Sequence, residues 1–134
     1  MKALWLVRLI LAVPTFLFIR IGVKYVIDPW QVAGSGMQLD SPAAVTDTRV
    51  VGAIFLGIAA LTLFSMFSER RFLAGLVLVA IVIGFVTAVR VLGFVVDGAA
   101  PETAFKLTPE VVILLLSAIG IFVEMRRQQQ LSAA

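Results

Sequence analysis

The stretch VVGAIFLGIAALTLFSMFS, residues 50–68, contains no charged residue and decides the fold class. A bilayer core about 30 Å thick is crossed by roughly 20 residues of helix, so this segment has the length of one transmembrane crossing. Arg49 precedes it and Glu69 follows it. Because a membrane-spanning backbone must satisfy its own hydrogen bonds, the stretch predicts a transmembrane α-helix.

Three further apolar runs flank this stretch. The run before it is interrupted by Arg8, Arg20 and Lys24, and the run after it only by Arg90. Two start signals, Ser41-Pro42 and Thr108-Pro109, combine an N-cap residue with a proline at the first helical position. The sequence therefore predicts an all-α protein with helices at about residues 3–27, 42–68, 72–96 and 109–126.

The domain organisation follows from length. Four crossings use about 80 of the 134 residues and leave about 50 for loops and ends, which predicts a single transmembrane domain over residues 1–134. The first run is longer than the apolar region of a signal peptide and no small-x-small cleavage site follows it before Asp28, so we expect it to be retained. Four crossings give an up-down-up-down integral membrane bundle with both termini on the same side.

The composition excludes several kinds of chemistry. The chain is 61% hydrophobic and 14% charged, and it contains neither cysteine nor histidine. Thiol exchange, histidine-ligated haem and the usual zinc or copper ligand sets are therefore excluded, and we predict no metal site and no cofactor. The net charge of +3 has no soluble basic face to carry it, so the sequence favours contact with membrane lipids and not with nucleic acid.

The charged residues differ between the two sides that these helices define. The side with the N-terminus has six basic and two acidic residues, and the opposite side has five basic and six acidic residues. Because lysine and arginine are in excess in cytoplasmic loops, both termini are predicted to be cytoplasmic. The first set comprises Lys2, Arg8, Arg70, Arg71, Arg126 and Arg127 with Glu69 and Glu124.

Several charges are predicted to lie at one depth near the outer boundary. Three arginines and Glu110 each lie roughly 16 to 20 residues along a helix from a charge at the cytoplasmic end, which is about one membrane crossing. On the second helix Arg49, Ala53 and Gly57 share a face, and the small pair predicts that this face points into the bundle. The candidate residues are Arg20, Asp47, Arg49, Arg90, Asp97 and Glu110.

Two interpretations of these charges remain open. Intramembrane charges usually face the bundle interior and find partners, so the set can be an ion-pair network that only fixes helix register. Alternatively, the arginines outnumber the nearby carboxylates and form an outer-leaflet pocket for a phosphate or carboxylate ligand. Arg8, Lys24 and Glu124 lie near helix ends, where we expect them to reach the membrane interface and have no role in a site.

Four segments carry a resemblance to a known family. They are Asp28-Pro29, LDSPAAVTDTRVVGAIFLGIAAL, AVRVLGFVVDGAAP and TPEVVILLLSAIGIF. Together they resemble the uncharacterised bacterial four-helix membrane proteins grouped as domain of unknown function 4345. The resemblance implies a four-helix fold in a bacterial inner membrane and a set of polar positions, but no reaction. Those positions are Asp47, Arg49, Gly52, Gly57, Arg90, Asp97, Gly98 and Glu110. Val51-Gly52 departs from the aromatic residue and paired glycines expected there.

Three functions are consistent with these observations. The first is a non-enzymatic membrane protein that binds an anionic lipid or another anionic amphiphile, with quinone binding as a variant. The second is an assembly or scaffold subunit that associates with a membrane protein partner or with further copies of itself. The third is an enzyme that uses Glu110 or Asp97 as general acid or base on a lipid substrate. No nucleophile-base pair is evident, so we assign no catalytic residue.

Overall fold

The computed structural model describes residues 2–30, 39–96, 98 and 101–132. Its elements are α1 (Lys2–Ile27), α3 (Pro42–Met66), the 3-10 helix η1 (Glu69–Arg71), α4 (Phe72–Val96) and α5 (Pro101–Ser132). Each α-helix contains a segment long and apolar enough to cross a membrane, and these are Leu4–Ile27, Pro42–Met66, Glu69–Val96, which includes η1, and Ala104–Ser132. The prediction of an all-α membrane bundle with four helices is confirmed.

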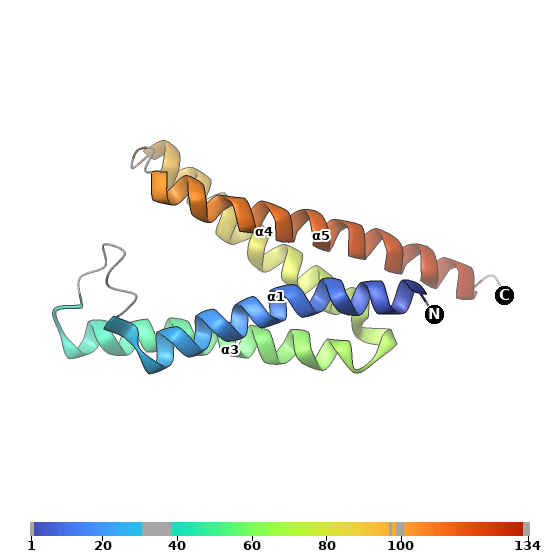
Figure 1. Ribbon diagram of the computed structural model, residues 1–134, viewed down its shortest axis with the longest axis horizontal. Helices are drawn as coiled ribbons and strands as arrows, with labels where there is room; N and C mark the ends of the chain where they lie inside the picture. The colour runs from blue at the N-terminus through green and yellow to red at the C-terminus, as the bar shows by residue number, and fades with distance from the viewer. Residues whose placement is uncertain (1, 31–38, 97, 99–100, 133–134) are drawn as a thin grey trace.

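The four helices form two antiparallel hairpins. In Figure 1, α1 pairs with α3 and α4 pairs with α5, and both chain termini lie at the same end. The two hairpins lie close together at this end and diverge toward the other. We call the first the closed end, which contains η1 and both termini, and the second the open end, where α1 and α4 finish and α3 and α5 begin.

The packing of the core explains the shape. Most of the apolar residues with the least exposure lie in the halves of α1, α3 and α4 nearer the closed end, while Phe18 of α1 and Ile113 of α5 lie just beyond the middle of their helices. Hydroxyl groups join α1 to α3 near the middle of α1, where Thr15 and Thr62 are hydrogen bonded at 2.8 Å between their Oγ1 atoms. The clustered core side chains are Val7, Ile10, Leu11, Phe18, Ala59, Phe72, Leu76, Val79, Ile83 and Ile113. The closed end therefore holds the two hairpins together.

Helix starts follow the predicted signals in one case and not in the other. Ser41 caps α3 by accepting a hydrogen bond from the Ala44 amide at 3.2 Å, and Pro42 occupies the first turn. The fourth helix, however, begins at Pro101 and not near 109, and it continues to Ser132 and not to 126. Pro101 supplies its own proline start, so Pro109 lies inside the helix, where a membrane helix tolerates the loss of one backbone donor. The bounds of α1, α3 and α4 differ from the predicted ranges by at most two residues.

The rotation of α3 corrects a second prediction. Ala53 and Gly57 are exposed, and a Cβ atom added at Gly57 would have no neighbour within 4 Å. Gly52 is buried instead, and an added Cβ atom there would lie 2.9 Å from the carbonyl oxygen of Gly22 on α1. The face with Arg49, Ala53 and Gly57 therefore points out of the bundle. The close approach at this point is made by Gly52 of α3 facing Gly22 of α1, because an added Cβ atom at Gly22 would likewise lie 2.8 Å from the Gly52 carbonyl oxygen.

This difference predicts opposite results for two alanine substitutions in the same helix. Gly52→Ala should destabilise the protein, because the new methyl group meets the Gly22 backbone and the Tyr25 Cβ atom, which lies 2.7 Å away. Gly57→Ala should leave stability equal or raise it by up to about 1 kcal/mol, because alanine is the better helix former. Denaturation of both purified variants in mixed micelles measures the effect. Equal stability of the two variants would contradict the observed rotation of α3.

Candidate functional site

An ion pair joins α4 and α5 toward the open end. Arg90 on α4 donates from Nε to both carboxylate oxygens of Glu110 on α5, at 2.9 and 3.0 Å, and from Nη2 to Oε1 at 2.6 Å. The two side chains are 28% and 10% exposed. Charge-assisted, forked pairs of this kind are among the stronger hydrogen bonds in proteins. The structure thus brings together two of the predicted site residues and links α4 to α5 with them.

The other predicted arginines do not join this pair. Arg20 on α1 and Arg49 on α3 are both exposed, and neither makes an ion pair with any residue that the structure describes. They belong to the hairpin that diverges from Arg90 at the open end (Figure 1). Asp47 is also exposed, and Asp97 lies outside the described residues. The expected layer is therefore divided between the two hairpins, and a ligand role for its members stays a prediction.

A groove separates α1 from α5 where the hairpins begin to diverge. It has a volume of about 520 Å³, and its lining is mostly apolar. Ile113 belongs to the core and Leu17 packs against it, so the groove adjoins the core at these two residues. Its apolar lining includes Val13, Phe16 and Leu17 of α1 with Phe105, Val112 and Ile113 of α5.

Two cations that make no ion pair with any described residue continue the α1 wall of this groove. Arg20 follows Phe16 by four residues and Leu17 by three, so it lies on the same face of the helix, one turn nearer the open end. Lys24, for which the sequence predicted no role in a site, follows one turn further on the same face and is also exposed. The Cα–Cβ bonds of a helix tilt toward its N-terminus, so the Arg20 side chain starts out toward the groove. An apolar groove and a cationic mouth thus share one face of α1.

The level of Arg20 can be compared with that of the ion pair. An added Cβ atom at Gly120 of α5 would lie 3.2 Å from Ile10 Cγ2 of α1, so these two residues are opposite one another. The helices are antiparallel, and Arg20 and Glu110 are each ten residues further toward the open end. Arg20 therefore lies near the depth of Glu110, as the residue count predicts, but on the other side of the groove.

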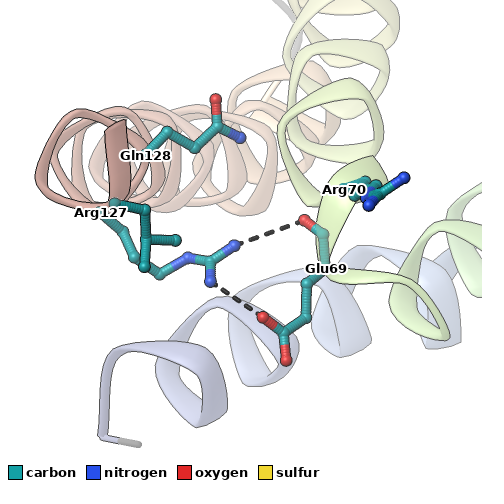
Figure 2. Close-up of a pocket in the computed structure, with 5 residues that line it drawn as sticks. Glu69, Arg70, Arg127 and Gln128 are labelled. Atoms are coloured by element: carbon teal, nitrogen blue, oxygen red, sulfur yellow. Dashed lines mark hydrogen bonds and ion pairs between the residues drawn. The ribbon is translucent and has the colours of Figure 1, made fainter. Parts of the chain in front are cut away.

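A second polar cluster lies at the closed end and was not expected. Glu124 is completely buried and accepts hydrogen bonds from Arg127 Nε at 2.9 Å and Nη2 at 2.8 Å, and from Gln128 Nε2 at 2.9 Å. Arg127 also donates from Nη1 to Glu69 Oε2 at 3.0 Å (Figure 2). The expectation that Glu124 reaches the interface is wrong, because Arg127 supplies a partner within the protein. The i, i+3 spacing of Glu124 and Arg127 is the signal that could have revealed the pair.

Few of the described side chains around this cluster are free to act on a substrate. A pocket of about 490 Å³ is bounded by Glu69, Arg70, Arg127, Gln128 and Leu131. Figure 2 shows the Arg127 guanidinium turned toward Glu69, while the Arg70 side chain points away from it. The cluster therefore connects α5 to the turn between α3 and α4 and acts as a brace between the hairpins. Among the described residues, no three carboxylates gather where they could hold a metal ion.

The fold and these polar positions define a small integral membrane protein built as a bundle of four spanning helices. Residues 6–121 match the family model described as a domain of unknown function (DUF4345), and the chain belongs to this family. The predicted family membership is confirmed. No curated protein and no solved structure gives a significant match to the chain.

Proposed function

We propose that this membrane protein binds an anionic lipid at its open end, with Arg20 and Lys24 of α1 as the ligands of the headgroup. The observation that carries the proposal is the position of Arg20, which is exposed beside an apolar groove and has no ion-pair partner among the described residues. An arginine at membrane depth is costly unless it finds a partner. Its planar fork suits a phosphate group, which every anionic phospholipid presents.

The orientation of the protein in the membrane forms part of the proposal. We take the closed end as cytoplasmic, because Arg8, Arg70, Arg71, Arg126 and Arg127 lie toward it, as the positive-inside rule requires. The open end then lies in the outer leaflet of a bacterial inner membrane. Headgroups of that leaflet have direct access to Arg20 and Lys24.

The ion pair supports a structural and not a chemical role for Glu110. Both of its carboxylate oxygens accept hydrogen bonds from Arg90, so the group is engaged within the protein and is not directed toward a substrate. This contact favours lipid binding over a carboxylate-dependent enzyme. The Arg90 charge is likewise neutralised, so among the described residues the cations available beside the groove are Arg20 and Lys24 on α1 and Lys106, next to Phe105, on α5.

Substitution of Arg20 tests the proposal. Arg20→Gln should lower the ratio of phosphatidylglycerol to phosphatidylcholine retained on the protein about tenfold, because loss of a charge-assisted hydrogen bond costs about 1.5–3 kcal/mol. Native mass spectrometry of protein released from nanodiscs containing equal amounts of the two lipids measures this ratio. Arg49→Gln is the matched control, because Arg49 is also exposed but lies on α3, which contributes no residue to the groove lining. The same ratio in both variants would refute the proposal.

A further inference from the structure

We infer that the groove between α1 and α5 holds an acyl chain of the bound lipid, which therefore enters between the two hairpins. The inference rests on the proposed function and adds the second half of the ligand. It assigns the apolar lining, which the headgroup proposal leaves without a role, to the hydrocarbon part of the same molecule.

The chemistry of the groove excludes water as its main occupant. Seven of the eight lining residues are apolar, and Thr108 is the remaining one. Water is retained in protein cavities where two or more polar groups bind it, so an apolar lining offers it too few partners. In a bilayer the alternative occupant is hydrocarbon, which surrounds the exposed side chains Val13, Phe16 and Val112 in any case.

The size of the groove argues against a helix from another protein. The lining of the groove on α5 extends from Phe105 to Ile113, about 12 Å of helix or little more than two turns. A spanning helix needs about 20 residues, or between five and six turns. A flexible hydrocarbon chain, in contrast, fits a short groove without requiring contacts along a whole membrane crossing.

Charge at the mouth of the groove determines which lipid fits. Arg20 and Lys24 lie one and two turns beyond the α1 lining on the same helix face, so a chain placed along that face brings its headgroup to the two cations. Thr108 provides a hydroxyl group on the α5 side, next to Pro109. An apolar lining that ends in two positive charges without an ion-pair partner among the described residues is complementary to an anionic lipid and not to a zwitterionic or neutral one.

The position of the groove gives the bound acyl chain an effect on the structure of the protein. The groove adjoins the core at Leu17 and Ile113, and the two hairpins diverge toward the open end (Figure 1). A chain between α1 and α5 would fill the space that this divergence creates. The lipid then acts as a wedge that keeps the open end apart, while the core and the Glu124 cluster keep the closed end together.

Crosslinking from the lipid acyl chain tests the groove separately from the headgroup site. The protein is placed in phosphatidylcholine nanodiscs that contain phosphatidylglycerol with a photoactivatable group in one acyl chain, and the adducts are mapped by peptide mass spectrometry. We expect adducts on Val13, Leu17 and Val112. Val112→Trp should reduce them at least fivefold by filling the groove. Val111→Trp is the matched control, because the neighbouring valine is similarly exposed and does not line the groove.

The outcomes separate the two proposals. Equal adduct yields in Val112→Trp and Val111→Trp would overturn the groove as the chain site, even if Arg20→Gln still loses its preference for phosphatidylglycerol. Adducts that Val112→Trp removes, with an unchanged lipid preference in Arg20→Gln, would overturn the headgroup site and with it the assignment of the chain to an anionic lipid. Circular dichroism and gel filtration of each variant establish that the fold is intact, so that a lost adduct reports on the groove.

Discussion

Arg90→Gln should lower the free energy of unfolding by about 3 kcal/mol, because removal of one partner from a buried ion pair leaves the other charge uncompensated. Glu110, which is then left behind, has a short side chain that is 10% exposed. Glu110→Gln should lower the free energy of unfolding by a smaller amount. Its remaining partner, Arg90, is 28% exposed and has a long stem that can carry the guanidinium toward the interface.

A double-mutant cycle identifies the pair as the cause. Arg90→Gln combined with Glu110→Gln removes both charges together, so the double variant should be more stable than Arg90→Gln alone. The wild-type protein, the two single variants and the double variant are unfolded with increasing amounts of a denaturing detergent. Circular dichroism follows the unfolding and gives the free energy of unfolding of each. Additive losses in the double variant would show that the two residues stabilise the protein independently, which is incompatible with the forked contact.

The depth of the charges could be predicted from the sequence, whereas their lateral positions could not. A count of residues along each helix places Arg90 and Glu110 near the same depth, which made Glu110 one of the possible partners of Arg90, and the structure shows that contact. The same count places Arg20 at this depth. A residue count contains no information on whether the two hairpins stay parallel or diverge. Their divergence separates the hairpin with Arg20 from the ion pair of Arg90 and Glu110 (Figure 1).

The rotation of α3 was missed because two patterns in the same helix compete. Ala53 and Gly57 form a small-residue pair, but Thr62 and Ser65 lie on a different face together with Gly52 and Ala59. The hydroxyl face is the buried one, and Thr62 is hydrogen bonded to Thr15 of α1. Polar side chains gain partners at helix contacts within a membrane, whereas an exposed glycine meets only lipid. If the hydroxyl groups had been weighted above the single pair of small residues, the sequence would have predicted the buried face of α3 correctly.

The second large effect is expected at the closed end, where Arg127→Gln should destabilise the protein by about 3–5 kcal/mol. Arg127 makes two of the three hydrogen bonds that side chains donate to Glu124, and the Glu124 side chain is completely buried. Without Arg127 the carboxylate retains only the Gln128 amide. The same substitution also removes the contact with Glu69, which connects α5 to the turn between the hairpins.

Two further variants show which of these contacts is responsible. Glu124→Gln in the Arg127→Gln background removes the stranded charge and should recover most of the lost stability, because the buried carboxylate is the source of the cost. Glu69→Gln should have a small effect, since the Glu69 side chain is 51% exposed and surface pairs contribute little. The matched control is Arg126→Gln, in which the neighbouring, exposed arginine stacks on Phe122.

Rescue by Glu124→Gln would establish Arg127 as the counter-ion of a buried carboxylate. If instead Glu69→Gln alone reproduced the loss, the brace between the hairpins would be the important contact, and the burial of Glu124 would carry no cost. This distinction matters for the lipid site, because the two hairpins must stay together at the closed end while the open end admits an acyl chain. A protein weakened at Glu124 should therefore lose the crosslinks in the groove together with its stability, whereas one altered only at Arg20 should lose the phosphatidylglycerol crosslinks and retain its stability.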